Sequence, residues 1–121
     1  MFTRKRLGQF ATVWIICLVA ISLQPYRPVG ESESLAHRAA HVFTFGVAAL
    51  ALLVVSDGRK QQWTAALGVF GLAVAIETAQ HLMYKNVFEW WDVRDDVIGV
   101  LVAVLIIRST PIRRRLLSDR D

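Results

Sequence analysis

The sequence is poor in cysteine, with a single residue, Cys17, in 121 positions. One thiol cannot form an internal disulfide or a thiolate cage for a metal, and inside an apolar run we expect Cys17 to be a small core residue. Serine is also scarce near the polar positions described below, where only Ser32 and Ser34 occur, in a loop. A hydrolase with a serine or cysteine nucleophile is therefore not expected.

Charge is missing from long stretches of the chain. No charged residue occurs from position 7 to 26, and 55% of the chain is hydrophobic, with a mean hydropathy of +0.42. Apolar residues gathered in such blocks are typical of membrane proteins, in which about 20 residues cross the hydrocarbon core. The net charge of +4 does not indicate nucleic-acid binding, because the basic residues lie at the ends of the apolar blocks and form no stripe interleaved with aromatics.

The apolar blocks predict an all-α integral membrane bundle of four transmembrane helices, in a single domain that covers residues 1–121. We expect helices at about 7–25, 36–56, 61–83 and 92–109, with a basic tail at 110–121. The fourth block is short, because about 11 uncharged residues between Asp96 and Arg108 reach only about 16 Å along a helix. The fourth helix must therefore begin near Asp92 to cross the bilayer.

Two features of these blocks leave alternatives open. The first block also resembles the core of a signal peptide, with a candidate cleavage site at Ala20-Ile21-Ser22, although an uncleaved anchor looks the same. In the third block small residues recur near four-residue spacing, which either allows close helix approach or reflects how common they are in membrane helices. These small residues are Gly68, Gly71, Ala75 and Ala79.

Lysine and arginine predict the orientation. With four spans, the N-terminus, the turn at Asp57 and the C-terminal tail share one side, which holds about ten of the fourteen basic residues. Since loops rich in lysine and arginine stay in the cytoplasm, we expect both termini to be cytoplasmic. Trp90 and Trp91 then lie at the opposite, outer interface, where they are expected to anchor the helix.

Ionisable residues of three expected helices fall at one depth. Counted from the cytoplasmic ends, the positions of His41, Glu77, Asp92 and Asp96 are all roughly 18 to 24 Å into the bilayer. Residues three or four apart share a helix face, which gives three polar groups. They are His37, Arg38 and His41; Glu77, Gln80 and His81; and Asp92, Asp95 or Asp96, and Gly99. Because ionisable groups inside a membrane are costly, they predict a functional polar cluster between the second, third and fourth helices, open to the outside.

Three elements resemble the VanZ-like family of small bacterial membrane proteins, over about residues 35 to 105: HRAAHVFTFGVAAL, ETAQH and NVFEWWDVRDDVIG. That family shows Asp-Lys-x-x-His-Phe, then Glu-x-x-Gln, then an arginine-rich loop before Asp-x-x-x-Asn-x-x-Gly. The matching positions are Arg38 and His41, Glu77 and Gln80, and Asp92, Asp96 and Gly99, whereas the departures are His37, Val42, Asn86 in place of arginine, and Asp96 in place of asparagine. The resemblance implies a bacterial cytoplasmic (inner) membrane protein and a link to resistance against the glycopeptide antibiotic teicoplanin.

Three hypotheses for the polar cluster stay open. In the first, the cluster binds or modifies an envelope lipid or a lipid-linked cell-wall intermediate, and the residues divide into two groups. The candidate substrate-binding residues are Arg38, Gln80 and Asp96, and the candidate catalytic residues are His41, Glu77 and Asp92. In the second, the protein is not an enzyme, and Arg38 and Arg94 neutralise Glu77, Asp92 or Asp96 in a structural ion network or a partner interface.

The third hypothesis is a metal site. Three pairs four residues apart, His37/His41, Glu77/His81 and Asp92/Asp96, have the spacing with which one helix supplies two ligands. No HExxH-like motif is present in the sequence, so we assign no metal and no cofactor. The expected partner is a membrane lipid or a lipid-linked substrate, with no nucleic acid, and the oligomeric state stays open.

Overall fold

The computed structural model describes residues 2–25 and 34–117. They form the helices α1 (Arg4–Ser22), α2 (Leu35–Val55), α3 (Gly58–Tyr84), α4 (Trp90–Ser109) and the short α5 (Ile112–Leu116). Within these two ranges no strand occurs, and one isolated bridge pairs Phe2 with Leu117. The predicted all-helical fold is confirmed for the described residues, while the expected loop around Pro28 and Gly30 lies outside them.

Local sequence explains where the helices begin and end. The Thr3 hydroxyl accepts a hydrogen bond from the Arg6 N–H at 3.3 Å, and Ser34 caps the start of α2 in the same way. Pro111 separates α4 from α5, because proline lacks the N–H donor that would continue a helix. None of the four long helices begins or ends more than three residues from its predicted bounds, and α5 occupies part of the predicted basic tail.

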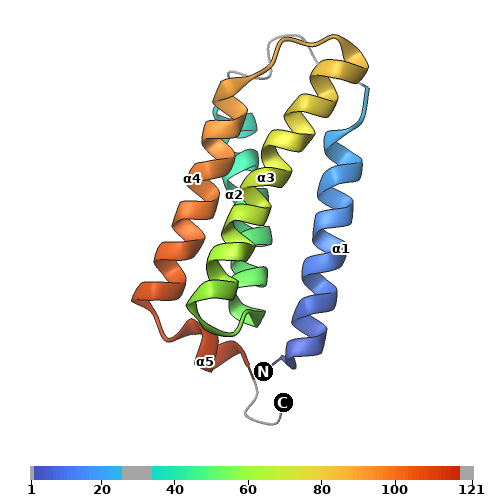
Figure 1. Cartoon of the computed structure of the whole chain (residues 1–121). Helices are drawn as coiled ribbons and strands as arrows, with labels where there is room; N and C mark the ends of the chain where they lie inside the picture. Colours follow the sequence, from blue (N-terminus) through green and yellow to red (C-terminus); the bar gives the residue numbers. More distant parts are fainter. Residues whose placement is uncertain (1, 26–33, 118–121) are drawn as a thin grey trace.

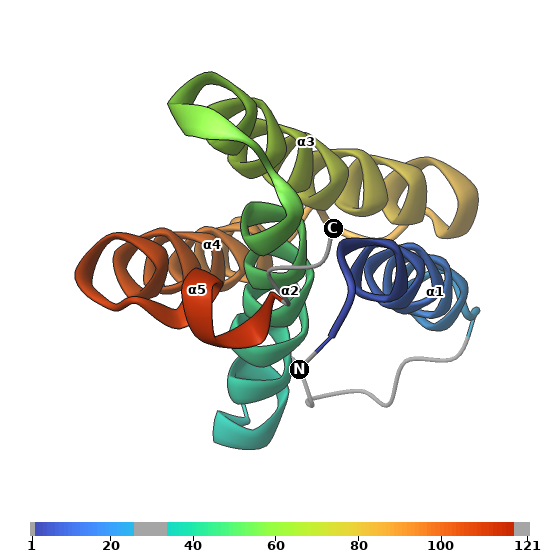
Figure 2. The ribbon, with the colours of Figure 1, turned by 90° about the horizontal axis from the view of Figure 1, so that it is seen from below.

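Helix α2 lies at the centre of the bundle and packs against α1, α3 and α4 (Figures 1 and 2). α2 and α4 run in the same direction, and their backbones come close together where Gly46 faces Gly99. A Cβ atom on Gly99 would overlap the Val42 carbonyl oxygen and lie 2.9 Å from the Gly46 nitrogen. The absence of side chains at this crossing therefore brings the N-terminal halves of α2 and α4 into contact.

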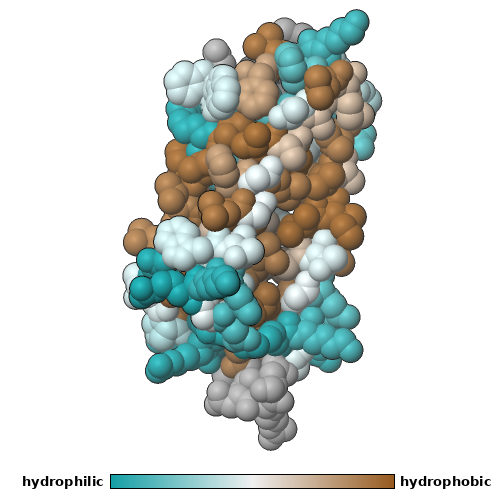
Figure 3. Space-filling view, in the orientation of Figure 1, coloured by the Kyte–Doolittle hydropathy of each residue, from teal (hydrophilic) through white to brown (hydrophobic). Residues whose placement is uncertain are grey.

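Three helices of the described residues, α1, α2 and α3, are long and apolar enough to cross a membrane. Figure 3 shows the corresponding hydrophobic belt between hydrophilic ends of the molecule. Large apolar side chains such as Ile16, Leu67 and Leu101 are exposed on its surface, which suits contact with lipid chains. α4 has a similar length of 20 residues, but charged side chains occupy its first two turns.

Both ends of the described chain lie at one end of the bundle, together with the α2–α3 turn (Figure 1). In this turn the Asp57 carboxylate forms ion pairs with Arg4 and, at 2.6 Å, with Arg113 of α5. The hydrogen bond from Arg4, assisted by the one from Arg113, holds the pKa of Asp57 below its ordinary value of 3.8. The contribution of this charged contact to stability is therefore complete at neutral pH and is lost as the pH falls through the lowered pKa.

The outward faces of α1 and α3 bear on two expectations from the sequence. The prediction that Cys17 is a core residue is wrong, because α1 turns Leu18 toward the bundle and leaves Cys17 exposed. On α3, a Cβ atom added to Gly68 or Gly71 would meet nothing within 4 Å. At these two positions the small residues do not mediate a contact between the described helices.

Candidate functional site

The ionisable residues near the start of α2 face those near the start of α4. Because these helices are parallel, residues four apart on α2 meet residues four apart on α4. His37 Nε2 lies 3.3 Å from Asp92 Oδ1, and His41 Nδ1 lies 2.8 Å from Asp96 Oδ1. The two imidazole rings are 4.6 Å apart, centroid to centroid. The predicted meeting of ionisable groups from separate helices at one level is confirmed for α2 and α4.

The His41 imidazole is held between two carboxylates. Its Nδ1 makes the short contact with Asp96, while its Nε2 lies 3.5 Å from Asp92 Oδ2. Asp92 and Asp96 are only 2% and 3% exposed, so the protein and not solvent surrounds them. A carboxylate on one ring nitrogen orients a histidine and determines which nitrogen faces its other neighbour.

Arg38 pairs with Asp95, a partner that the sequence hypotheses did not name. Arg38 Nε donates to Asp95 Oδ2 at 3.2 Å, and Arg94 donates to Asp95 Oδ1 through Nε and Nη2 at 2.9 and 2.6 Å. The Arg94 guanidinium also lies 4.6 Å from the centre of the Trp91 ring. Asp95 is 1% exposed, and its burial between two arginines is understandable because a buried carboxylate needs a cationic partner.

The C-terminal end of α3 contributes Glu77 and Gln80, and both are buried. Glu77 Oε1 accepts a hydrogen bond from the Glu89 N–H at 2.6 Å, just before α4 begins. The Gln80 amide donates to the Ser22 carbonyl at the end of α1. His81 is exposed on the other side of α3, where its Nδ1 lies 2.5 Å from the Asn86 carbonyl oxygen. The structure thus brings Glu77 and Gln80 into the bundle and leaves His81 out.

These residues surround an inner cavity of about 250 Å³ between the four long helices. Its polar wall contains His37, His41, Glu77, Gln80 and Asp96, so every predicted site residue except Arg38 and Asp92 lines it. Its remaining lining is largely apolar and includes residues of α1 such as Leu18 and Ile21. The cavity places two imidazoles, two carboxyl groups and an amide around one space, which suits proton transfer or metal binding.

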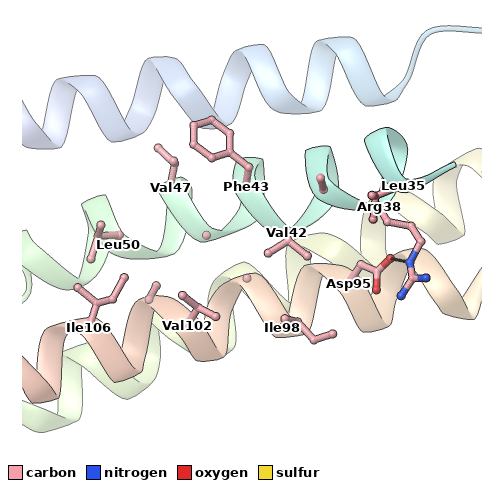
Figure 4. A pocket seen from close by; sticks show the side chains of 14 residues that line it. Leu35, Arg38, Val42, Phe43, Val47, Leu50, Asp95, Ile98, Val102 and Ile106 are labelled. Atoms are coloured by element: carbon pink, nitrogen blue, oxygen red, sulfur yellow. Dashed lines mark hydrogen bonds and ion pairs between the residues drawn. The ribbon is translucent and has the colours of Figure 1, made fainter.

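A second hollow, the α2–α4 groove, runs along the outside of the same helix pair (Figure 4). It has a volume of about 540 Å³ and is lined almost entirely by apolar side chains. Among them are Leu35, Val42, Val47, Leu50, Val102 and Ile106. Figure 4 shows the ion pair of Arg38 and Asp95 at one end of the groove. The groove is therefore amphipathic along its length, with a charged end and an apolar body.

No protein-family model matches this chain, and neither a curated protein nor a solved structure matches it. The resemblance to the VanZ-like family therefore rests on the residues of the three sequence elements alone. The functional argument has to start from the geometry of the polar residues, the cavity and the groove.

Proposed function

We propose that this chain is a four-span protein of the bacterial inner membrane, with both termini in the cytoplasm, that binds a phosphate-bearing amphiphile from the outer leaflet. The amphiphile is an envelope lipid or a lipid-linked cell-wall intermediate, in keeping with the VanZ-like resemblance. The observation that carries the proposal is the α2–α4 groove, which joins an apolar body to an arginine at the end of the bundle opposite the termini.

Burial of its carboxylates supports α4 as the fourth span. Asp92, Asp95 and Asp96 are at most 3% exposed, and they face arginine and histidine side chains instead of the outer surface of the helix. The 20 residues of α4 reach about 30 Å, the thickness of the hydrocarbon core. Lipid would therefore meet an apolar outer face, while the charges are satisfied within the protein.

Arg38 supplies the headgroup contact. Its side chain is 47% exposed, and its Nε bond to Asp95 is the single hydrogen bond that its side chain makes within the described residues. The other guanidinium N–H groups can bind a phosphate, which arginine does in bidentate fashion. Arg38, Arg94 and Asp95 together carry one surplus positive charge, which favours an anionic headgroup at this end of the groove.

The body of the groove accommodates the lipid chain. Its volume of about 540 Å³ lies within the range of typical ligand cavities, about 300–1,000 Å³. The groove lies on the outer surface of the apolar helices α2 and α4, where lipid chains have direct access. If the bound amphiphile is modified, the groups suited to acid–base chemistry are His41, Glu77 and Asp92.

A second function is favoured by the pairing of Asp95 with two arginines. A carboxylate that is 1% exposed and bonded to Arg38 and Arg94 is the arrangement expected of an ion network that fixes helix register. In that case the protein is not an enzyme, and Arg38 contributes to folding or to a partner interface. Replacement of Arg38 separates the two functions, because the binding role predicts a folded protein that has lost its lipid preference.

The test measures lipid retained by the full chain. Protein purified from mixed micelles that contain equal amounts of phosphatidylglycerol and phosphatidylcholine is extracted, and both lipids are quantified by mass spectrometry. We expect the wild type to retain phosphatidylglycerol in at least tenfold preference and Arg38→Gln to lose most of this preference. A parallel experiment with a polyprenyl phosphate distinguishes a phospholipid from a lipid-linked intermediate.

Matched variants make this test specific. Arg59→Gln removes an exposed arginine at the opposite end of the bundle and should leave the lipid preference unchanged. Val102→Trp fills the groove and should lower retention of both lipids, whereas Leu105→Trp, an exposed position of α4 outside the groove, should not. Equal lipid preference in the wild type and a folded Arg38→Gln variant would refute the binding function. Comparison of the same variants for teicoplanin susceptibility tests the implied link to resistance.

A further inference from the structure

Three potential metal ligands converge between the first turns of α2 and α4. The side chains of His37, His41 and Asp92 each offer one nitrogen or oxygen atom, and these atoms all lie within 4.8 Å of one another. Both histidines present Nε2 to the Asp92 carboxylate, at 3.3 Å for His37 and 3.5 Å for His41. Two neutral nitrogens and one carboxylate form a ligand set that zinc enzymes use.

The spacing of these atoms suits a shared ion better than direct hydrogen bonds. Hydrogen bonds from N–H to oxygen are commonly about 2.7–3.2 Å long, and charge-assisted ones are shorter still. The contacts of the two rings with Asp92 exceed this range: His37 Nε2 lies 3.3 and 3.4 Å from the two carboxylate oxygens, and His41 Nε2 lies 3.5 Å from Oδ2. Two ligands of a tetrahedral ion that each lie about 2.0–2.1 Å from the metal are about 3.3 Å apart. Measured to the one oxygen that both rings approach, Asp92 Oδ2, the separations are 3.4 Å for His37 and 3.5 Å for His41, close to this tetrahedral edge length.

The contact of His41 with Asp96 supports the same assignment. Nδ1 lies 2.8 Å from Asp96 Oδ1, and with Asp96 ionised it is the nitrogen that donates its proton, because a carboxylate can only accept. In neutral His41 the Nε2 lone pair then points toward Asp92, so an acceptor faces an acceptor. A cation between them removes this conflict. A carboxylate behind a ligating histidine is also the common arrangement in zinc sites, where it orients the ring.

Charge in the inner cavity also favours a cation. Asp96 and Glu77 line the cavity beside His37 and His41, and Asp92 lies against both imidazoles. Three carboxylates thus gather around two imidazoles, while the arginines Arg38 and Arg94 pair with Asp95 outside this group. A divalent ion would balance most of the negative charge of these buried carboxylates.

We propose that His37, His41 and Asp92 bind one zinc ion, with Asp96 as the positioning residue that orients His41. The fourth coordination position faces the inner cavity, which both histidines line, and is open to water or to an anionic group. Of the three pairs with metal-ligand spacing in the sequence, the structure selects His37/His41. It excludes His81, which is exposed and contacts the Asn86 carbonyl instead.

The experiment measures zinc bound to the full chain without a polyhistidine tag. Protein in detergent is stripped with a chelator, reloaded with zinc, freed of excess metal and analysed for zinc by mass spectrometry, while calorimetry gives the affinity. We expect one zinc ion per chain in the wild type. His37→Gln and His41→Gln should each weaken binding at least 100-fold, and Asp96→Asn should weaken it about 10- to 100-fold through loss of ring orientation.

His81→Gln is the matched control, because His81 is the third histidine of the chain and lies outside the proposed site. It should bind zinc like the wild type, and circular dichroism should show the same helix content in every variant compared. Absence of bound zinc in the wild type overturns the proposal whatever the variants do. Equal loss in His81→Gln and His37→Gln also overturns it. No lipid takes part in this measurement, so its outcome is independent of the lipid retention test.

Discussion

Glu77, a candidate acid–base residue, binds a backbone N–H group before α4. Its Oε1 accepts from the Glu89 N–H at 2.6 Å, and the Glu89 carbonyl in turn accepts from the Asp92 N–H at 3.1 Å. Glu77 thus holds Glu89, the residue just before α4, about one turn from the carboxylates that face α2. Its position in the cavity wall is compatible with proton transfer, but its hydrogen bond indicates a positioning role as well.

Removal of the Glu77 carboxylate should therefore destabilise the protein. Glu77→Ala removes the acceptor of the half-buried Glu89 N–H, a loss of about 1 kcal/mol or more in the free energy of unfolding. Glu77→Gln keeps an acceptor oxygen and should retain most of the stability. Unfolding in mixed micelles with increasing SDS, followed by tryptophan fluorescence, measures the difference. Thr78→Ala, at an exposed neighbour, is the control, and a Glu77→Ala protein as stable as this control would contradict the role.

Sequence could predict which polar residues share a level in the membrane, but not all of their partners. Counting residues from the cytoplasmic ends places His41 and Asp96 at one depth, and they do meet at 2.8 Å. The rotation of each helix about its axis is not determined by such counting, because side-chain fit between helices sets it. For this reason Arg38 was expected to face Glu77, Asp92 or Asp96, whereas it pairs with Asp95.

At the scale of elements, the parallel pair of α2 and α4 positions the site. The close approach at Gly46 and Gly99 allows the imidazoles of α2 to reach the carboxylates of α4. The apolar blocks in the sequence were sufficient to predict the helices, because block length and flanking charges determine where a span ends. They were not sufficient to predict this crossing. The small residues of α3 had the expected spacing, but Gly68 and Gly71 face outward.

Replacement by alanine should have opposite effects on stability at the packed Gly99 and at the outward-facing Gly71. In Gly99→Ala the new Cβ would overlap the Val42 carbonyl oxygen, which is backbone and cannot move alone, so α4 must shift. Overpacking of this kind costs about 1–3 kcal/mol or more. Gly71→Ala, in the interior of α3 with nothing within 4 Å, should be neutral or stabilising by up to about 1 kcal/mol. SDS titration of both variants measures these effects, and equal stability of the two would contradict the close α2–α4 contact.

At the scale of the whole molecule, the two ends of the bundle differ in chemistry. One end carries both described chain ends and the ion pairs of Asp57 with Arg4 and Arg113. The other end carries the polar cluster, the cavity and the charged end of the groove. Since basic segments stay in the cytoplasm, this asymmetry predicts that the site faces outward. The prediction depends on whether α4 crosses the membrane. This helix carries four charged residues in its first two turns.

The single native cysteine makes the proposed topology directly testable. In a Cys17→Ser background, cysteine reporters replace Arg59 in the α2–α3 turn, Lys85 between α3 and α4, and Arg114 in α5. We expect a membrane-impermeant maleimide to label Lys85→Cys in intact spheroplasts, and to label Arg59→Cys and Arg114→Cys only after permeabilisation. If α4 does not cross, Arg114→Cys reacts on the same side as Lys85→Cys. Labelling of Arg59→Cys and Arg114→Cys but not of Lys85→Cys in intact spheroplasts would show the opposite orientation, and the groove would then open to the cytoplasmic leaflet.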